Sequence, residues 1–139
     1  MDLEDVAPTV GVGACVALLV ALGIPYVAVT DAGPTLGAYY ASGPVGSGGI
    51  AFMSLLTVVV LLSGTRGTAE PDLVAGIALV LGVVTFALAV LWAVSVDPTV
   101  LFSFPPSAAW IANHRWVVVA LAAVVPLAAA GYARGVLWR

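Results

Sequence analysis

Charged residues are almost missing from this 139-residue chain. Lys, Arg, Asp and Glu make up 8% of it, and there is no lysine, whereas a soluble domain carries about 25% charged residues. Four apolar stretches, 9–29, 48–63, 73–96 and 116–133, contain no Asp, Glu, Lys, Arg or His. This shortage of charged residues excludes the polar surface of an ordinary soluble domain. Four arginines without a basic cluster also argue against nucleic-acid binding.

Cysteine and histidine occur once each, as Cys15 and His114. A lone cysteine cannot form an intramolecular disulfide, and a lone histidine without Cys, Asp or Glu at ligand spacing cannot build a haem or transition-metal site. No hydroxyl lies in a recognisable nucleophile turn, and the glycine-rich segments 11–13 and 46–49 lack the lysine of a phosphate loop. We therefore expect no metal site, no cofactor and no enzymatic activity.

The chain does have long hydrophobic segments. Hydrophobic residues make up 63% of it and the mean hydropathy is +1.18. An apolar run of about 20 residues crosses the hydrocarbon layer as a helix, and the run 73–96 is apolar on every face, unlike a barrel strand. The sequence predicts an all-α, integral membrane four-helix up-and-down bundle in one domain, 1–139. The predicted spans are 9–29, 46–63, 73–96 and 116–133, with outer loops at 30–45 and 97–115.

The few arginines predict the orientation of these spans. An even number of spans places both termini on one side, together with Arg66, Arg134 and Arg139, while the opposite side carries only Arg115. The positive-inside rule then places both termini in the cytoplasm and the chain in the cell membrane as a multi-pass protein. Prolines within the first and fourth spans predict kinks there.

The two outer loops differ from ordinary polar connections. The first is dense in Gly and Pro around a Tyr39–Tyr40 pair, and the sequence leaves open whether it is compact or mobile. The second holds Phe102, Phe104 and Trp110, which we expect on the membrane surface, with 107–114 forming either a short interfacial helix or an extension of the last span. Asp97 and Arg115, which bracket this loop, are expected to pair.

Aromatic and polar side chains near these loops are the candidates for contact with a partner or a lipid headgroup. Trp92 and Trp116 lie at the predicted outer ends of spans, and Tyr132 lies at an inner end, where amphipathic rings anchor helices at headgroup depth. The candidate contact residues are Tyr39, Tyr40, Trp110, His114, Arg115 and Trp116.

Small residues recur every fourth position on two spans. Close approach of helix backbones needs such residues, because lipid supplies no hydrophobic drive for association. Whether these stripes meet inside one bundle or between subunits stays open. The expected helix-packing residues are Gly13, Ala17 and Ala21 on the first span, and Ala78 and Gly82 on the third.

Several short segments carry a resemblance. They are the acidic start followed by 7–11 (Ala-Pro-Thr-Val-Gly), 37–43 in the first outer loop, 91–94 (Leu-Trp-Ala-Val), 114–116 (His-Arg-Trp) and 132–134 (Tyr-Ala-Arg). The chain resembles an uncharacterised haloarchaeal family of small four-span membrane proteins. The resemblance implies a topology and a haloarchaeal source but no activity, and the missing lysine and the acidic excess also indicate a salt-adapted source.

Three functions fit these features. The first is a structural or accessory membrane subunit that acts through helix packing and its outer loops, with the bilayer and other membrane subunits, or further copies of itself, as partners. The second is a small oligomeric transporter or channel, for which Ser54, Thr57, Thr85 and backbone carbonyls are the only polar lining. The third is a lipid- or quinone-binding redox component with an outer headgroup site at the loop tyrosines and the His–Arg pair.

Overall fold

The computed structural model describes residues 3–28, 33–104 and 109–138. Within these ranges the chain is helical and contains no strand. Four of the helices include segments that are long and apolar enough to cross a membrane, which confirms the predicted all-α fold with four long apolar helices. The helices are α1 (Leu3–Ala28), α2 (Gly33–Tyr40), α3 (Gly46–Thr65), α4 (Pro71–Ser95), α5 (Pro98–Phe102) and α6 (Ile111–Leu137).

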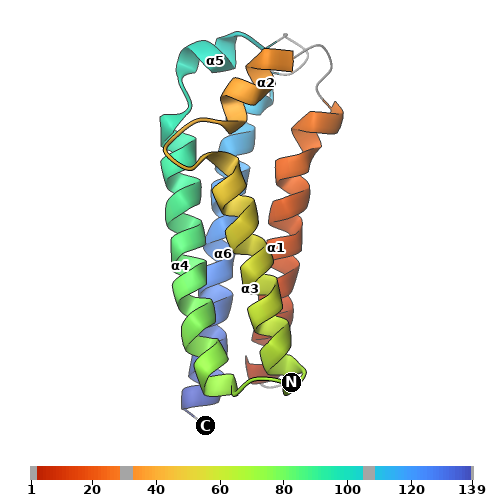
Figure 1. The fold of residues 1–139 in the computed structure, drawn as a ribbon, viewed down its shortest axis with the longest axis vertical. Helices are drawn as coiled ribbons and strands as arrows, with labels where there is room; N and C mark the ends of the chain where they lie inside the picture. The colour runs from red at the N-terminus through yellow and green to blue at the C-terminus, as the bar shows by residue number, and fades with distance from the viewer. Residues whose placement is uncertain (1–2, 29–32, 105–108, 139) are drawn as a thin grey trace.

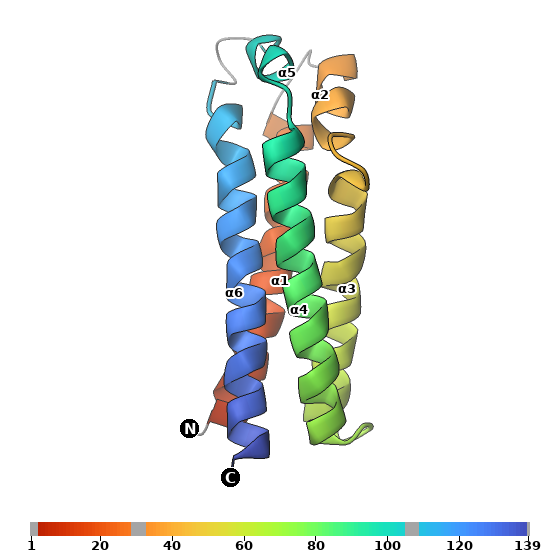
Figure 2. The same ribbon diagram turned by 90° about the vertical axis from the view of Figure 1, so that its left-hand side faces the viewer.

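The four long helices lie side by side and alternate in direction (Figure 1). Around the bundle, α1 contacts α3, α3 contacts α4, α4 contacts α6, and α6 returns to α1. The two termini lie at one end, which we call the termini end, and the short helices α2 and α5 lie at the other (Figure 2). We call α2, α5 and the first two turns of α6 the cap.

Both outer connections contain a short helix. The first connection holds α2, so its described part is compact. In the second, α5 lies earlier than the predicted interfacial helix, because the Asp97 carboxylate accepts a hydrogen bond from the Thr99 N–H at 2.8 Å and Pro98 occupies the first helical position. Residues from Ile111 onward extend the last long helix, while 105–108 lie outside the described residues.

Helices α4 and α6 come into close contact at a glycine and a proline. A Cβ on Gly82 would lie 2.9 Å from the Cα and 3.0 Å from the nitrogen of Pro126. Ala78, one turn earlier on α4, is fully buried. Backbone atoms cannot move aside as a flexible side chain can, so only glycine fits at position 82.

The small residues predicted to share one packing face of α1 differ in burial. Gly13 is exposed, with nothing within 4 Å of a built Cβ, and Ala17 is half-buried, whereas Ala21 is buried. The close approach occurs instead at Gly11, where a Cβ would lie 2.8 Å from Cδ1 of Leu61 on α3. Residues 11 and 13 are about 200° apart around a helix. Any packing role of Gly13 is therefore left to a contact between chains.

The hydroxyls that could line a pore face the interior of the bundle. Ser54, Thr57 and Thr85 are fully buried. Each donates to the carbonyl four residues earlier on its own helix, at 2.9, 2.7 and 2.7 Å respectively. Such bonds satisfy the hydroxyl locally without a partner on another helix, so these side chains act as packed core residues in this structure.

Replacing Gly82 by alanine tests the close approach of α4 to α6. We expect Gly82→Ala to lower the free energy of unfolding by about 1–3 kcal/mol, because the added methyl overlaps the Pro126 backbone. Gly76→Ala on the same helix is the matched control, since a Cβ there meets nothing within 4 Å, and it should be neutral or stabilising by up to about 1 kcal/mol. Equilibrium unfolding in detergent measures both changes. Equal effects of the two variants would contradict this packing.

Candidate functional site

The single histidine of the chain joins two helices of the cap to α1. His114, on the first turn of α6, is 6% exposed. Its Nε2 lies 2.6 Å from the carbonyl oxygen of Ala21 on α1, and its Nδ1 lies 2.8 Å from the hydroxyl of Tyr39 on α2. A carbonyl only accepts, so Nε2 carries the proton and donates, and in the neutral ring Nδ1 accepts from Tyr39. Both ring nitrogens are therefore used in holding α1, α2 and α6 together.

The Ala21 carbonyl needs this donor because of the proline that follows it. Pro25 lies inside α1, four residues after Ala21. It has no N–H, so the helix itself cannot bond the Ala21 oxygen, and a buried carbonyl without a donor is costly. The imidazole of His114 supplies the missing hydrogen bond. Pro25 thus leaves a carbonyl unpaired on one span, and His114, 89 residues later, supplies its hydrogen bond.

Two further side chains bond backbone carbonyls in the same region. The Tyr40 hydroxyl donates to the carbonyl of Leu22, next to Ala21 on α1. The indole Nε1 of Trp92 on α4 donates to the carbonyl of Tyr39 at 3.0 Å. That carbonyl belongs to the last turn of α2, where no helical N–H follows to bond it. These bonds fix α2 between α1 and α4.

Arg115 bonds the end of α4 instead of the expected carboxylate. Its Nη1 lies 2.9 Å from the carbonyl oxygen of Ala93 and 3.5 Å from that of Val96. The predicted Asp97–Arg115 pair is therefore wrong in this structure, because the Asp97 side chain caps α5. A guanidinium at a helix C-terminus interacts favourably with the negative end of the helix dipole, and Arg115 also lies over the Trp116 ring at 5.2 Å.

Aromatic rings surround this hydrogen-bond network. The ring centroid of Tyr39 lies 5.1 Å from that of Trp92, 5.8 Å from that of Phe104 and 5.9 Å from that of His114. These are the distances of edge-to-face aromatic packing. Burial raises the pKa of Tyr39 well above its usual value, with the Arg115 charge opposing. The Tyr39 hydroxyl therefore keeps its proton and remains a donor.

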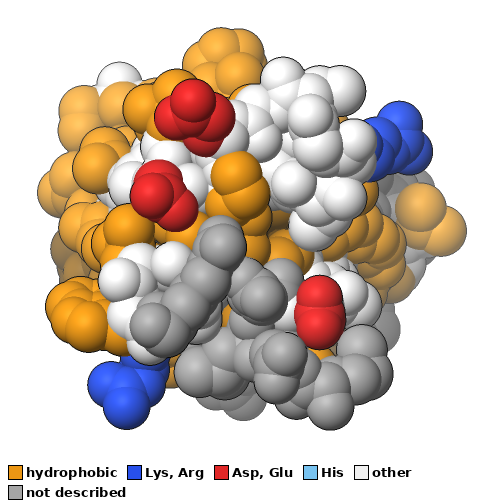
Figure 3. All heavy atoms as spheres, turned by 90° about the horizontal axis from the view of Figure 1, so that it is seen from below, with side chains coloured by type: hydrophobic (Ala, Val, Ile, Leu, Met, Phe, Trp, Pro, Cys, Tyr) orange, Lys and Arg blue, Asp and Glu red, His pale blue; other side chains and the backbone are white. Residues whose placement is uncertain are grey.

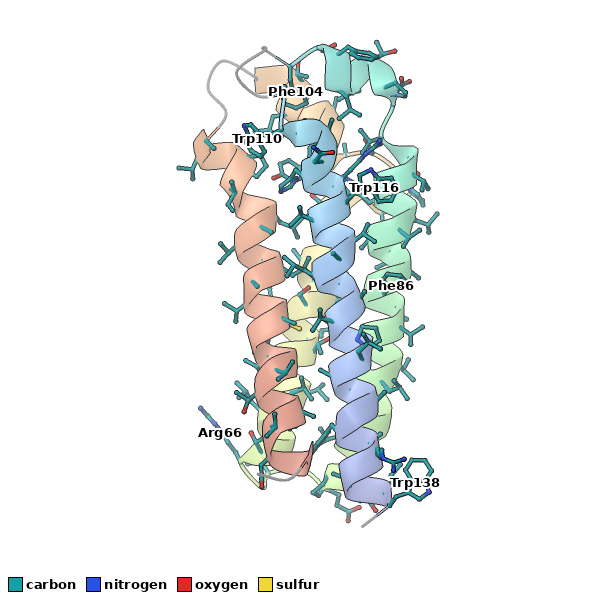
Figure 4. All side chains as sticks on the ribbon, turned by 180° about the vertical axis from the view of Figure 1, so that it is seen from behind. Arg66, Phe86, Phe104, Trp110, Trp116 and Trp138 are labelled. Atoms are coloured by element: carbon teal, nitrogen blue, oxygen red, sulfur yellow. The ribbon has the colours of Figure 1, made fainter. Side chains whose placement is uncertain are left out.

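The structure divides the predicted contact residues into two groups. Tyr39, Tyr40 and His114 are buried, so their predicted contact with a partner or headgroup is corrected: their polar atoms already bond the chain itself. Contact through Arg115, which is half-buried, stays a prediction. Trp110 and Trp116 keep exposed surface, with Trp116 46% exposed, and contact through them also stays a prediction. Figure 4 shows both at the cap end, with Phe104 beside them.

Two predicted interfacial anchors have a different role. Trp92 and Tyr132 are 1% and 3% exposed, so both are core side chains rather than surface rings. The sequence signal that could have revealed the role of Trp92 is weak, because a tryptophan near a span end fits both an anchor and a cap. The signal for Ala21 is stronger, since any residue four positions before a mid-helix proline has an unpaired carbonyl.

The chemistry of the cap follows from these bonds. The Tyr40 hydroxyl, the Trp92 indole and Nη1 of Arg115 donate to backbone carbonyls, and the Tyr39 hydroxyl bonds His114, whereas Nε of Arg115 is buried without a hydrogen-bond partner among the described residues. The described part of the chain contains no group of three or more His, Cys, Asp or Glu that could hold a metal ion. The geometry therefore supports a rigid cap that fixes the ends of helices.

The bond between His114 and Ala21 can be tested through Pro25. We expect His114→Phe to lower the free energy of unfolding by about 2 kcal/mol, because the Ala21 carbonyl loses its donor. In a Pro25→Ala background the loss should shrink by about 1 kcal/mol, since the new N–H bonds that carbonyl within α1. Pro126→Ala is the control background and should leave the loss unchanged. Unfolding titrations in detergent of the native chain, the three single variants and the two double variants measure this coupling, and strict additivity with Pro25→Ala would refute it.

Comparison with known proteins places the chain in a family. No curated protein and no solved structure matches it. One family, described as a family of unknown function (DUF7548), matches residues 1–137. That match covers nearly the whole chain and includes all four long helices and the cap, so the protein belongs to the DUF7548 family of unknown function.

Proposed function

We propose that this protein is a structural or accessory subunit of a membrane assembly. The observation that carries the proposal is the use of the polar groups of the cap: His114, Tyr39, Tyr40 and Arg115 all bond the chain itself. A cap whose polar side chains bond the chain itself is suited to presenting a fixed surface. The proposal assigns the chain no catalytic role.

The exposed surface of the cap includes several aromatic rings. Phe102 on α5 is 87% exposed, and Trp110 and Trp116 are partly exposed. Exposed aromatic side chains on a rigid support are common anchors of protein–protein contacts. We propose that this surface contacts another subunit at the outer side of the cell membrane, with both termini in the cytoplasm. The orientation rests on the arginines, and the haloarchaeal source on composition and resemblance.

The transporter alternative has less support. Its candidate lining hydroxyls, Ser54, Thr57 and Thr85, are buried and bond their own helices. A conduction path would need polar groups that a solvated ion or substrate could reach. The redox alternative also loses its headgroup site, since the tyrosines and the histidine expected there are buried.

A native pull-down tests the proposed role. The full chain is purified from its natural membrane in mild detergent, and a second membrane protein is expected in fixed stoichiometry. Phe102→Ser should release this partner, because it removes the most exposed aromatic ring of the cap. Trp138→Ser is the matched control, since Trp138 is also highly exposed but lies at the termini end (Figure 4).

Two outcomes contradict the accessory role, and a third contradicts the cap as the contact surface. A pure homo-oligomer that conducts ions in liposomes supports the transporter alternative. A pigment or quinone that co-purifies supports the redox alternative. Release of the partner by Trp138→Ser as readily as by Phe102→Ser would show that the cap is not the contact surface.

A further inference from the structure

The termini end of the bundle contains a cavity of about 500 Å³. All four long helices line it, through Asp5 and Thr9 of α1, Thr65 of α3, Pro71 of α4, and Tyr132 and Val136 of α6. This volume falls within the range of small-molecule sites, which are mostly apolar with a few placed polar groups. The cavity lies at the opposite end of the bundle from the cap.

The position of the cavity follows from the contact between α1 and α3. Leu61 packs against Gly11. The lining residues of α3 all follow Leu61, and most of those of α1 precede Gly11, so the cavity lies on the side of this contact that faces the termini. Val12 and Leu62 give it an apolar inner wall. Gly64 brings the backbone of α3 against the Tyr132 hydroxyl, because a Cβ there would lie 2.9 Å from that oxygen.

Asp5 gives this cavity its charge. Its carboxylate is exposed, and no salt bridge joins it to any cation among the described residues. Arg66 follows the lining residue Thr65 but extends away from the bundle (Figure 4). Seen from the termini end, acidic side chains lie over the end face and basic side chains lie at its edge (Figure 3).

The helix dipoles do not offset this charge. At the termini end α1 and α4 present N-termini, while α3 and α6 present C-termini. Two positive and two negative helix ends largely cancel. The carboxylate therefore sets the sign of the site, and hydroxyls of Thr9 and Thr65 and apolar side chains complete its wall.

We propose that this cavity binds a molecule that joins an ammonium group to an apolar body. The ammonium group lies at the Asp5 carboxylate, and the apolar body lies against Val12, Leu62 and Val136. Such a group can come from a soluble amine or from the amine headgroup of a phospholipid. The site is independent of the accessory role proposed for the cap, since it lies at the other end of the bundle.

Calorimetric titration of the full chain in phosphatidylcholine nanodiscs tests the site. The probe is 4-phenylbutylammonium, and 4-phenylbutanol is its uncharged match. We expect the ammonium to bind more tightly than the alcohol, and Asp5→Asn to weaken ammonium binding about fivefold, as expected for one exposed ion pair. Glu70→Gln is the matched control, because Glu70 is exposed near the same end without lining the cavity, and its effect should stay below about twofold.

Further measurements distinguish a soluble amine from a lipid headgroup as the ligand and check that each variant is folded. Val12→Phe fills the inner wall and should weaken the ammonium and the alcohol alike, while unfolding curves confirm that each variant folds. Adding phosphatidylethanolamine to the nanodiscs should weaken probe binding in the native chain but not in Asp5→Asn if the lipid is the source. No change on adding it identifies a soluble amine. Equal binding of ammonium and alcohol, or equal effects of Asp5→Asn and Glu70→Gln, overturns the proposal.

Discussion

The cap depends on one constraint: a backbone carbonyl that a helix leaves without a donor must find one elsewhere when it is buried. Pro25 creates such a carbonyl at Ala21, and the last turns of α2 and α4 create others. Side chains of different helices supply the donors, with His114 bonding α1, Trp92 bonding α2 and Arg115 bonding α4. Each bond joins two helices, so the same contacts that satisfy the carbonyls also fix the helix ends in place.

Pro25, in the last turn of α1, and Pro126, in the middle of α6, are accommodated in different ways. At Pro25 an imidazole from α6 bonds the freed carbonyl. At Pro126 the neighbouring helix comes close enough that only a glycine fits, and Gly82 supplies it. Close backbone packing at Pro126 and a side-chain hydrogen bond at the Pro25 site both accommodate a proline without a charged group. The chain can accordingly keep its long apolar helices and still contain prolines within them.

The two ends of the bundle differ in how their polar groups are used. At the cap the tyrosines, the histidine and the arginine all bond the chain, and aromatic rings pack around them. At the termini end a carboxylate without a salt bridge among the described residues borders a cavity with an apolar inner wall. A fixed surface and an open site therefore lie about one helix length apart, which allows them to serve different partners.

The sequence by itself determined the four long apolar helices and the approximate positions of their ends, because hydrophobic length and the positions of Gly, Pro and Asp are local properties that any span must satisfy. It also showed that Ala78 and Gly82 could lie in a close helix contact. Only the tertiary structure decided that Gly11 rather than Gly13 faces α3, since the rotation of α1 depends on its neighbours. The pairing of His114 with Ala21 and Tyr39 was likewise decided only there, because hydrogen bonds between residues 93 and 75 positions apart depend on where three helices end in space.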